Sequence, residues 1–317
     1  MALSEFELIE RYFKKAPRSS GIIISGGDDA AIIRPIAGQD LVQCMDTMVE
    51  GRHFDANTPA HAIGYKLVAV NFSDLAAMGA QPQSFQLALT LPHVNPSWLE
   101  RFSQGLFECA DAFNAELIGG DTTSGATTLS VLANGSVPHG QAIPRSGARP
   151  GELIYVSGHL GGASAALTEL NNHKSPAPDL LRSLHYPTAR VALGQGLRPI
   201  ATACIDLSDG LAADLGKLLN ASGIGGTVHT PRLPLHPNLN GNTTDAVQHA
   251  LTGGDDYELC FCVPPDKANQ VEALHKQLGL ALTVIGETHA AREFTIVDGN
   301  QNTVQLAHTG WDHFPKP

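Results

Sequence analysis

Apolar residues recur along the first half of the chain with two spacings, and each spacing predicts a different element. Apolar positions three and four residues apart predict amphipathic helices, whereas short apolar runs bounded by Gly, Pro or Asp predict strands. We expect helices at 6–13, 60–78 and 96–115, and strands at 41–45, 84–91 and 128–137. Asn71 and Asp74 are one turn apart on the same face of the second helix, so that face could point toward a site.

The second half continues the same mixture of elements. We expect strands at 153–156, 203–207, 259–263, 282–285 and 294–297, and helices at 161–171, 187–200, 211–220 and 267–278. Alternation along 259–263 places Cys260 and Cys262 on one strand face, where they pack as small apolar groups. The fold class is therefore α/β (α+β).

A segment rich in Pro and Gly separates the two halves. Residues 138–151 contain three Pro and three Gly without apolar periodicity, which is the composition of turns and linkers. A chain of 317 residues also favours two domains over one. We expect an N-terminal domain at 1–140 and a C-terminal domain at 150–317.

The amino-acid composition argues against several classes of binding partner. The formal net charge of −11 and the pI near 5.6 argue against a broad basic surface for nucleic acid. Five cysteines without a C-x-x-C pair suggest neither a disulfide framework nor a zinc site. The N-terminus lacks the basic start of a signal peptide, and no apolar run reaches the roughly 20 residues that span a bilayer. We expect a cytoplasmic protein with no membrane partner.

Several short segments combine glycines with aspartates. Glycine allows the close backbone approach that a phosphate needs, and a carboxylate is a hard oxygen ligand for Mg²⁺. Taken singly, each segment is more often a turn or a helix cap. Their number favours metal-bound polyphosphate, because carboxylates about 4 Å apart repel by roughly 4 kcal/mol unless cations lie between them. They occur at 27–29, 120–121, 206–210 and 254–256, with Asp46 and Asp74 in related settings.

Other nucleotide and catalytic motifs are missing from the sequence. The chain has no G-x-x-x-x-G-K-[ST] segment, and the turn at 158–162 lacks the full dinucleotide fingerprint. It also has no G-x-S-x-G elbow, no H-E-x-x-H and no kinase H-R-D or D-F-G set. The sequence thus predicts an enzyme that handles a nucleoside triphosphate with aspartates in place of a P-loop.

An ordered set of motifs resembles the thiamine-monophosphate kinase family. The individual aspartate loops also occur in related aminoimidazole ribonucleotide synthetases, selenophosphate synthetases and a hydrogenase-maturation protein. Three motifs favour the kinase: Asn-Phe-Ser-Asp-Leu-Ala-Ala-Met-Gly-Ala at 71–80, Gly-Gly-Asp-Asp-Tyr-Glu-Leu at 253–259 and Trp-Asp-His-Phe at 311–314. The remaining motifs lie at 26–31, 46–47, 53–54, 119–123, 145–151 and 205–211, so the resemblance covers almost the whole chain in order.

This resemblance implies a fold, a partner and a reaction. It implies a two-domain, aminoimidazole ribonucleotide synthetase-like architecture whose N-terminal sheet forms a homodimer interface, with ATP at the dimer-related cleft. It also implies transfer of the γ-phosphoryl group of ATP to thiamine monophosphate with the help of several Mg²⁺ ions. The products would be thiamine diphosphate and ADP.

The same resemblance implies a role for individual residues. The expected Mg²⁺ ligands are Asp29, Asp46, Asp74, Asp121, Asp206 and Asp209. The expected ATP contacts are Gly120, Asp121, Arg145 and Ser208. The expected contacts to thiamine monophosphate are His53, Asp255 and Trp311.

The chain departs from the family pattern at two places. Cys44 and Met45 precede Asp46 where the family usually has Ser-Thr, so only backbone carbonyls remain as ligands there. Asp255 stands where the family often has Glu, a longer carboxylate. Two other functions stay open, namely another ATP-dependent synthetase of the same superfamily and a non-catalytic Mg·ATP-binding sensor.

Overall fold

The computed structural model describes residues 5–239, 243–311 and 314. Of the residues discussed above, only Asp312 and His313 of the C-terminal motif lie outside the described part. The chain divides into two compact units, residues 1–75 with 80–140 and residues 76–79 with 141–317, which we call unit 1 and unit 2. Each unit is described by itself.

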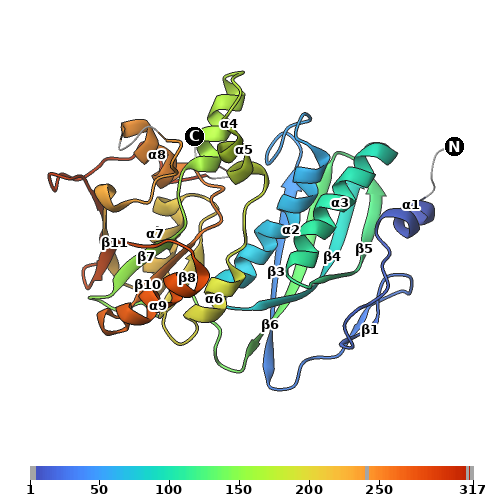
Figure 1. Cartoon of the computed structure of the whole chain (residues 1–317), viewed down its shortest axis with the longest axis horizontal. Coiled ribbons are helices and arrows are strands. Elements are labelled where there is room, and N and C mark those ends of the chain that lie inside the picture. The colour runs from blue at the N-terminus through green and yellow to red at the C-terminus, as the bar shows by residue number, and fades with distance from the viewer. Residues whose placement is uncertain (1–4, 240–242, 312–313, 315–317) are drawn as a thin grey trace. The chain divides into compact units, whose positions relative to one another are not determined.

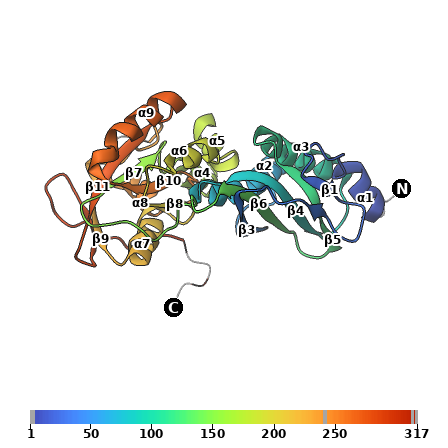
Figure 2. The ribbon, with the colours of Figure 1, turned by 90° about the horizontal axis from the view of Figure 1, so that it is seen from below.

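Unit 1 is a four-stranded sheet with helices on one face (Figures 1 and 2). The strand order is β3-β6-β4-β5, in which β4 and β5 are parallel and the other neighbours are antiparallel. Helices α2 and α3 cover one face. In chain order the elements are α1 (Glu5–Tyr12), β1 (Ile22–Ile24), β2 (Ile32–Ile33), β3 (Gln39–Val49), α2 (Ala60–Ala77), β4 (Gln81–Leu91), α3 (Pro96–Ala112), β5 (Glu116–Ser124) and β6 (Thr128–Pro138).

Alternation along the edge strand β3 divides its side chains between the two faces. The Cys44 thiol lies 3.1 Å from the backbone oxygen of Asn71 in α2, and Met48 is 3% exposed, so this face is turned toward the helices. Met45, on the opposite face, is 59% exposed. Asp46 shares the helix-facing side with Cys44 and Met48, because side chains alternate along a strand.

Unit 2 is built on a six-stranded sheet in the order β12-β9-β11-β7-β10-β8. All neighbours are antiparallel except the pair β12 and β9. Its elements are β7 (Leu153–Ser157), α4 (Gly162–Asn171), α5 (Pro178–His185), α6 (Val191–Leu197), β8 (Ala203–Asp206), α7 (Leu211–Ser222), β9 (Gly225–His229), η1 (Thr230–Arg232), α8 (Thr244–Thr252), β10 (Leu259–Val263), η2 (Pro265–Lys267), α9 (Ala268–Leu278), β11 (Leu282–His289) and β12 (Phe294–Val297).

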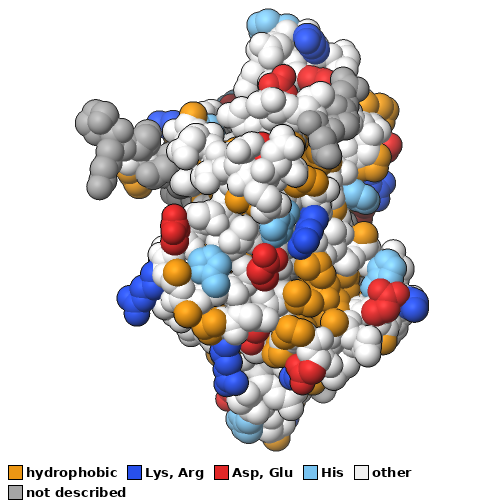
Figure 3. All heavy atoms as spheres, turned by 90° about the vertical axis from the view of Figure 1, so that its left-hand side faces the viewer, with side chains coloured by type: hydrophobic (Ala, Val, Ile, Leu, Met, Phe, Trp, Pro, Cys, Tyr) orange, Lys and Arg blue, Asp and Glu red, His pale blue; other side chains and the backbone are white. Residues whose placement is uncertain are grey.

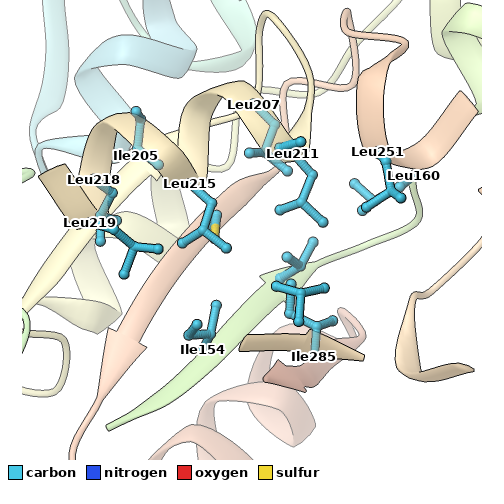
Figure 4. Packing of buried hydrophobic residues seen from close by; sticks show 14 of the residues in the cluster. Ile154, Leu160, Ile205, Leu207, Leu211, Leu215, Leu218, Leu219, Leu251 and Ile285 are labelled. Carbon is cyan, nitrogen blue, oxygen red and sulfur yellow. The ribbon is translucent and has the colours of Figure 1, made fainter. Parts of the chain in front are cut away.

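Both faces of this sheet are buried. Leu211, Leu215 and Leu218 of α7 pack on Ile154 and Ile285 of the sheet, as Figure 4 shows. On the other face, α6 and α9 pack over Tyr155 and Phe261, whose rings are stacked with centroids 5.4 Å apart. Strands that are buried on both faces appear in the sequence as continuous apolar runs. The apolar run at 259–263 therefore predicts strand β10 correctly.

Cys260 and Cys262 lie in one buried cluster, as alternation along their strand predicts. Both residues are 0% exposed. Burial raises the pKa of both thiols, which keeps them protonated and unreactive.

Three predictions about local structure were wrong. Asp46 lies inside the 11-residue strand β3, not at the tip of a shorter strand, because polar residues on the exposed face of this edge strand hide its apolar pattern. The Gly119-Gly120-Asp121 segment is part of strand β5, not a loop. The helix expected at 187–200 is only α6, because the side chain of Arg190 is held by the buried Glu258 and its backbone is not helical.

Several elements were not predicted at all. Helices α5 and α8 and strand β9 follow stretches rich in Pro, Gly, Asn and Thr, which predict loops. The buried Leu180 and Leu184 of α5 are four residues apart, so helical spacing was an available signal there. Among the described residues, no helix combines the length and apolar character that crossing a bilayer requires.

Candidate functional site

Unit 1 contains a cleft of about 1270 Å³ that brings two of the Gly/Asp segments together. Its wall is formed by α1, by the loop between β1 and β2, and by the sheet face that carries no helix. Asp29 lines it from the loop, and Gly120 and Asp121 line it from β5. All three residues are exposed to solvent.

The two segments approach each other closely. A Cβ atom on Gly26 would lie 3.8 Å from the Cα atom of Gly119. A Cβ atom on Gly120 would lie 1.8 Å from the backbone oxygen of Leu87 in β4, so only glycine fits at this position. The cleft thus combines bare backbone with carboxylates, the surroundings that a metal-bound phosphate requires.

Asp46 and Asp74 form a separate group on the helix side of the same sheet. The backbone N–H of Asp46 donates to the side-chain oxygen of Asn71 at 3.0 Å, and the Asn71 amide donates to the backbone oxygen of Leu67 at 2.9 Å. Asp74 follows one turn later on α2, on the face that Asn71 directs toward β3. This helix face therefore lies against Asp46, and its facing a functional site stays a prediction.

The two groups are distinct within unit 1. Strand pairing aligns Thr47 with Ser130, Ser130 with Ala88, and Ala88 with Asp121, so Asp121 shares the open face with Thr47. Asp46 faces the other way. Since β3 and β5 are three strand spacings apart, their backbones are roughly 14 Å apart along the sheet.

His53 lies in the turn that follows β3. Its Nδ1 atom accepts a hydrogen bond from the backbone N–H of Val49 at 3.0 Å. In the neutral imidazole the proton must then be on Nε2.

In unit 2 the loop 206–210 is the centre of the candidate site. The backbone oxygen of Ser208 accepts from the N–H of Asp255 at 2.9 Å, and that of Asp209 accepts from the N–H of Trp311 at 3.0 Å. Asp206, at the end of β8, is buried, whereas the Trp311 ring is 51% exposed. Four candidate residues from three distant parts of the sequence, Ser208, Asp209, Asp255 and Trp311, are thereby joined through backbone hydrogen bonds.

The adjoining segment 253–258 has a strained backbone. Asp255 and Tyr257 have φ angles of 64° and 49°, which non-glycine residues adopt infrequently. Between them, Asp256 accepts from the N–H of Gly161 at 2.9 Å, while its second carboxylate oxygen is buried without a partner in the part of the chain that the structure describes. Desolvation raises the pKa of Asp256 well above its ordinary value.

A buried ion pair lies at the C-terminal end of this segment. Glu258 is 5% exposed, and the guanidinium group of Arg190 donates to both of its carboxylate oxygens. Ser157 donates to the same carboxylate at 2.5 Å. This network fixes the point at which the strained segment enters β10.

Arg145 lies apart from the loop 206–210. Its side chain is exposed, and its backbone oxygen accepts from the Ser222 hydroxyl at 3.2 Å. The same hydroxyl accepts from the N–H groups of Gly147 and Ala148, both at 3.2 Å. Ser222 ends α7 whereas Ser208 precedes its start, so the two expected ATP contacts are at opposite ends of a helix about 18 Å long.

Among the described residues, no three side chains of His, Cys, Asp or Glu are grouped closely enough to hold a metal ion by themselves. The donor set nevertheless suits Mg²⁺, which favours carboxylate oxygens and usually keeps several waters and substrate phosphate oxygens as ligands. A cationic group already stands beside one candidate ligand, since the Lys217 ammonium contacts Asp209.

Lys217, Asp214 and Ser222 were missed by sequence reasoning. Asp214 and Lys217 are three residues apart on a helix that begins directly after Asp209, and this spacing was the available signal. Nothing in the sequence links Ser222 to Arg145, which is 77 positions away.

Two family models match the chain. The model of the AIR synthase related protein, N-terminal domain, matches residues 27–137, and that of the AIR synthase related protein, C-terminal domain, matches residues 149–299. Thiamine-monophosphate kinase of Salmonella typhimurium is 42% identical to the chain, with 100% of both proteins covered. Thiamine-monophosphate kinase of Bacillus subtilis is 31% identical, over 98% of the chain and 100% of that protein.

Solved structures of thiamine-monophosphate kinases also resemble the chain. Thiamine-monophosphate kinase from Stenotrophomonas maltophilia has a TM-score of 0.86 and 42% identity, over 93% of this chain and 97% of that one. A structure described as AaThiL complexed with AMPPCP and TMP has a TM-score of 0.79 and 29% identity, over 88% and 89% of the two chains. A hydrogenase maturation protein, HypE, has a TM-score of 0.79 at 17% identity over 99% of both chains, a likeness of fold alone.

Proposed function

Because the chain belongs to the thiamine-monophosphate kinase family, we propose that it transfers the γ-phosphoryl group of ATP to thiamine monophosphate, with thiamine diphosphate and ADP as products. The observation that carries this proposal is the similarity over the full length to relatives of that name. The solved relative complexed with AMPPCP and TMP adds support, since these ligands correspond to the two proposed substrates.

We assign the triphosphate to the Gly/Asp segments. The proposed ATP contacts are Gly120 and Asp121 in the cleft of unit 1 and Ser208 and Arg145 in unit 2. The bare backbone at Gly120 supports this assignment, because a Cβ atom there would collide with Leu87. The proposed ATP contacts are thus divided between the expected domains at 1–140 and 150–317.

We assign Mg²⁺ to the carboxylates of both units. The proposed ligands are Asp29, Asp46, Asp74, Asp121, Asp206 and Asp209. Bound Mg²⁺ supplies charge neutralisation for the triphosphate and for the phosphoryl group in transit. The shared cleft of Asp29 and Asp121 and the hard oxygen chemistry of the set support the assignment.

The acceptor would be held by His53, Asp255 and Trp311. His53 would donate from Nε2 to the phosphate group, because its Nδ1 is occupied by the N–H of Val49. The carboxylate of Asp255 would face the cationic thiazolium ring, and the half-exposed indole of Trp311 offers a flat stacking surface.

The proposed reaction is an in-line displacement at the γ-phosphorus. The attacking group is a phosphate oxygen that is already ionised near neutral pH, so the chain needs no general base. The residues named above would act by alignment and by electrostatic stabilisation.

We further propose that the chain acts as a cytoplasmic homodimer that pairs through the N-terminal sheet at its edge strand β3. Leu41 and Met45 are 65% and 59% exposed on β3, and Ile36, three residues before this strand, is 44% exposed. A group of exposed apolar side chains of this kind is typical of an association surface.

Mass-spectrometric detection of thiamine diphosphate after incubation with ATP, Mg²⁺ and thiamine monophosphate tests the proposal. ADP that forms only when thiamine monophosphate is present supports the kinase. ADP formation that does not depend on it would point to another synthetase of the superfamily, and stoichiometric ATP binding without any product would point to a sensor.

Asp121→Asn and Asp46→Asn test the metal assignment. Each variant should lose at least a hundredfold in kcat at limiting Mg²⁺, because a neutral amide is a poor ligand for this ion. Asp111→Asn is the matched control, since it removes an exposed carboxylate of unit 1 outside the cleft. Wild-type rates in both site variants would refute the assignment.

A further inference from the structure

Lys217 places its ammonium group beside a proposed metal ligand. The residue lies two turns into α7 and points back to the loop that precedes the helix. Its Nζ atom donates to the Asp209 carboxylate and, at 2.8 Å, to Asp214. The lysine side chain is 45% exposed, that of Asp209 30% and that of Asp214 1%.

Asp214 connects this lysine to the backbone of the loop. One oxygen of its carboxylate binds Lys217, and the other accepts from the N–H groups of Asp209 at 2.9 Å and Gly210 at 3.2 Å. Burial raises the pKa of Asp214, and the hydrogen bond from Lys217 opposes that rise. The charge of Lys217 therefore supports a buried carboxylate that sets the shape of the loop.

The same ammonium occupies the space in which a cation would approach Asp209 from the α7 side. A lysine ammonium group is ordinarily charged at neutral pH, and here it forms ion pairs with Asp209 and Asp214. A divalent ion at Asp209 must either displace this group or accept a positive charge beside it.

We propose that Lys217 is a built-in cation of the loop 206–210, which neutralises Asp209 in the absence of a divalent ion and competes with divalent ions for its carboxylate. Lys217 is thus a positioning residue that weakens the metal site at Asp209. The inference rests on the metal role of Asp209 in the proposed function. It predicts that a divalent ion binds Asp209 less tightly than it would if Lys217 carried no positive charge.

Binding of Mn²⁺ to the full chain, without nucleotide, tests this proposal. In Lys217→Met, the affinity of one site should rise about fivefold or more, the size of a single partly exposed charge interaction. Lys276→Met is the matched control, because it removes an exposed lysine from an ion pair on another helix of unit 2. Isothermal titration and the free Mn²⁺ signal in electron paramagnetic resonance measure the affinities.

A purely structural role would give a different pattern. If Lys217 only supported Asp214, Lys217→Met would lower the melting temperature and leave Mn²⁺ affinity unchanged or weaker, and the proposal would be overturned. Lys217→Gln is the second variant should Met impair folding, since its amide can still donate and the same rise in affinity is expected. Lys217→Arg keeps the charge and should retain wild-type affinity.

Asp209→Asn separates this inference from the proposed function. In the double variant with Lys217→Met, the gain in Mn²⁺ affinity should disappear, because the Asp209 carboxylate that Lys217 contacts has been replaced by an amide. If Asp209→Asn binds Mn²⁺ as the wild type does, Asp209 is no metal ligand and the inference fails. The kinase assay is unaffected by that result, since it reads product formation directly.

Discussion

Asp256 is the buried carboxylate for which the structure gives no full set of partners. One of its oxygens accepts from Gly161, and the other is buried without a hydrogen bond in the described chain. Desolvation raises its pKa well above the ordinary value of 3.8. At pH values between the unfolded and the folded pKa, the folded protein holds a proton at this position that the unfolded chain releases.

This proton makes stability depend on pH. A carboxyl whose pKa is raised by folding contributes stability that is fully present below about pH 4 and is lost as pH rises through the folded pKa. Asp256→Asn keeps an acceptor for Gly161 and removes the titration. Its free energy of unfolding, measured in urea at pH 5 and pH 8, should change less between the two values than that of the wild type.

Asp179→Asn is a suitable control for this comparison, because Asp179 lies in the first turn of α5 at the surface of unit 2. It should keep the pH dependence of the wild type. An unchanged pH dependence in Asp256→Asn would mean that this carboxyl is ionised in the folded protein.

For single residues, the sequence predicted which side chains could bind a metal or a phosphate better than it predicted which side chains contact one another. Gly120, Asp121 and Asp29 stood out because several Gly/Asp segments recur along the chain, although each one alone is an ordinary turn motif; the cleft of unit 1 brings these three together. Lys217 could not, because a lysine on a helix is ordinarily a solvated surface residue. Its role depends on the fold bringing its ammonium group to Asp209, which local sequence does not encode.

Strand β5 is the element that most constrains the proposed nucleotide site. It pairs in parallel with β4, and Gly120 lies where any side chain would meet the backbone of Leu87. Sequence reasoning treated this stretch as a loop because its glycines and polar residues lack apolar alternation. The close pairing of two backbones, not the burial of side chains, makes it a strand.

Gly120→Ala should therefore damage the sheet and the cleft together. The Cβ atom would lie 1.8 Å from a backbone oxygen, and φ at this position is +151°, so we expect a loss of about 3 kcal/mol or more in unfolding free energy. Thermal or urea unfolding checks this value. Gly26→Ala is the control, because its Cβ atom would make only an ordinary contact at 3.8 Å.

Helix α7 illustrates what apolar periodicity does predict. Leu211, Leu215 and Leu218 follow helical spacing, and all three are buried against the unit 2 sheet (Figure 4). Leu215→Ala should cost roughly 2 to 5 kcal/mol in unfolding free energy, as truncation of a fully buried leucine usually does. A loss below 1 kcal/mol in urea unfolding would mean that the core closes over the cavity.

The chain as a whole carries an excess of negative charge. On the face of the described structure that Figure 3 displays, Lys and Arg side chains are scattered singly among acidic and apolar ones. This distribution agrees with the net charge of −11. Small phosphorylated ligands bound through metal ions remain the partners that this surface favours.

The proposed homodimer can be tested at the exposed strand β3. Met45→Glu would place a charge in the centre of an apolar interface and should convert the dimer to a monomer in analytical ultracentrifugation. Val94→Glu changes an apolar residue that is 39% exposed outside this strand, and it should leave the assembly intact. A wild-type chain that sediments as a monomer at micromolar concentration would refute the dimer.

The candidate acceptor site in unit 2 is joined through main-chain atoms. Asp255 and Trp311 are attached to the loop 206–210 by their own N–H groups, and neither bond uses a side chain. Exchange of either side chain therefore leaves the attachment in place, provided that the residue at 255 tolerates a positive φ. A substitution of either side chain can therefore change the recognition surface without removing its support.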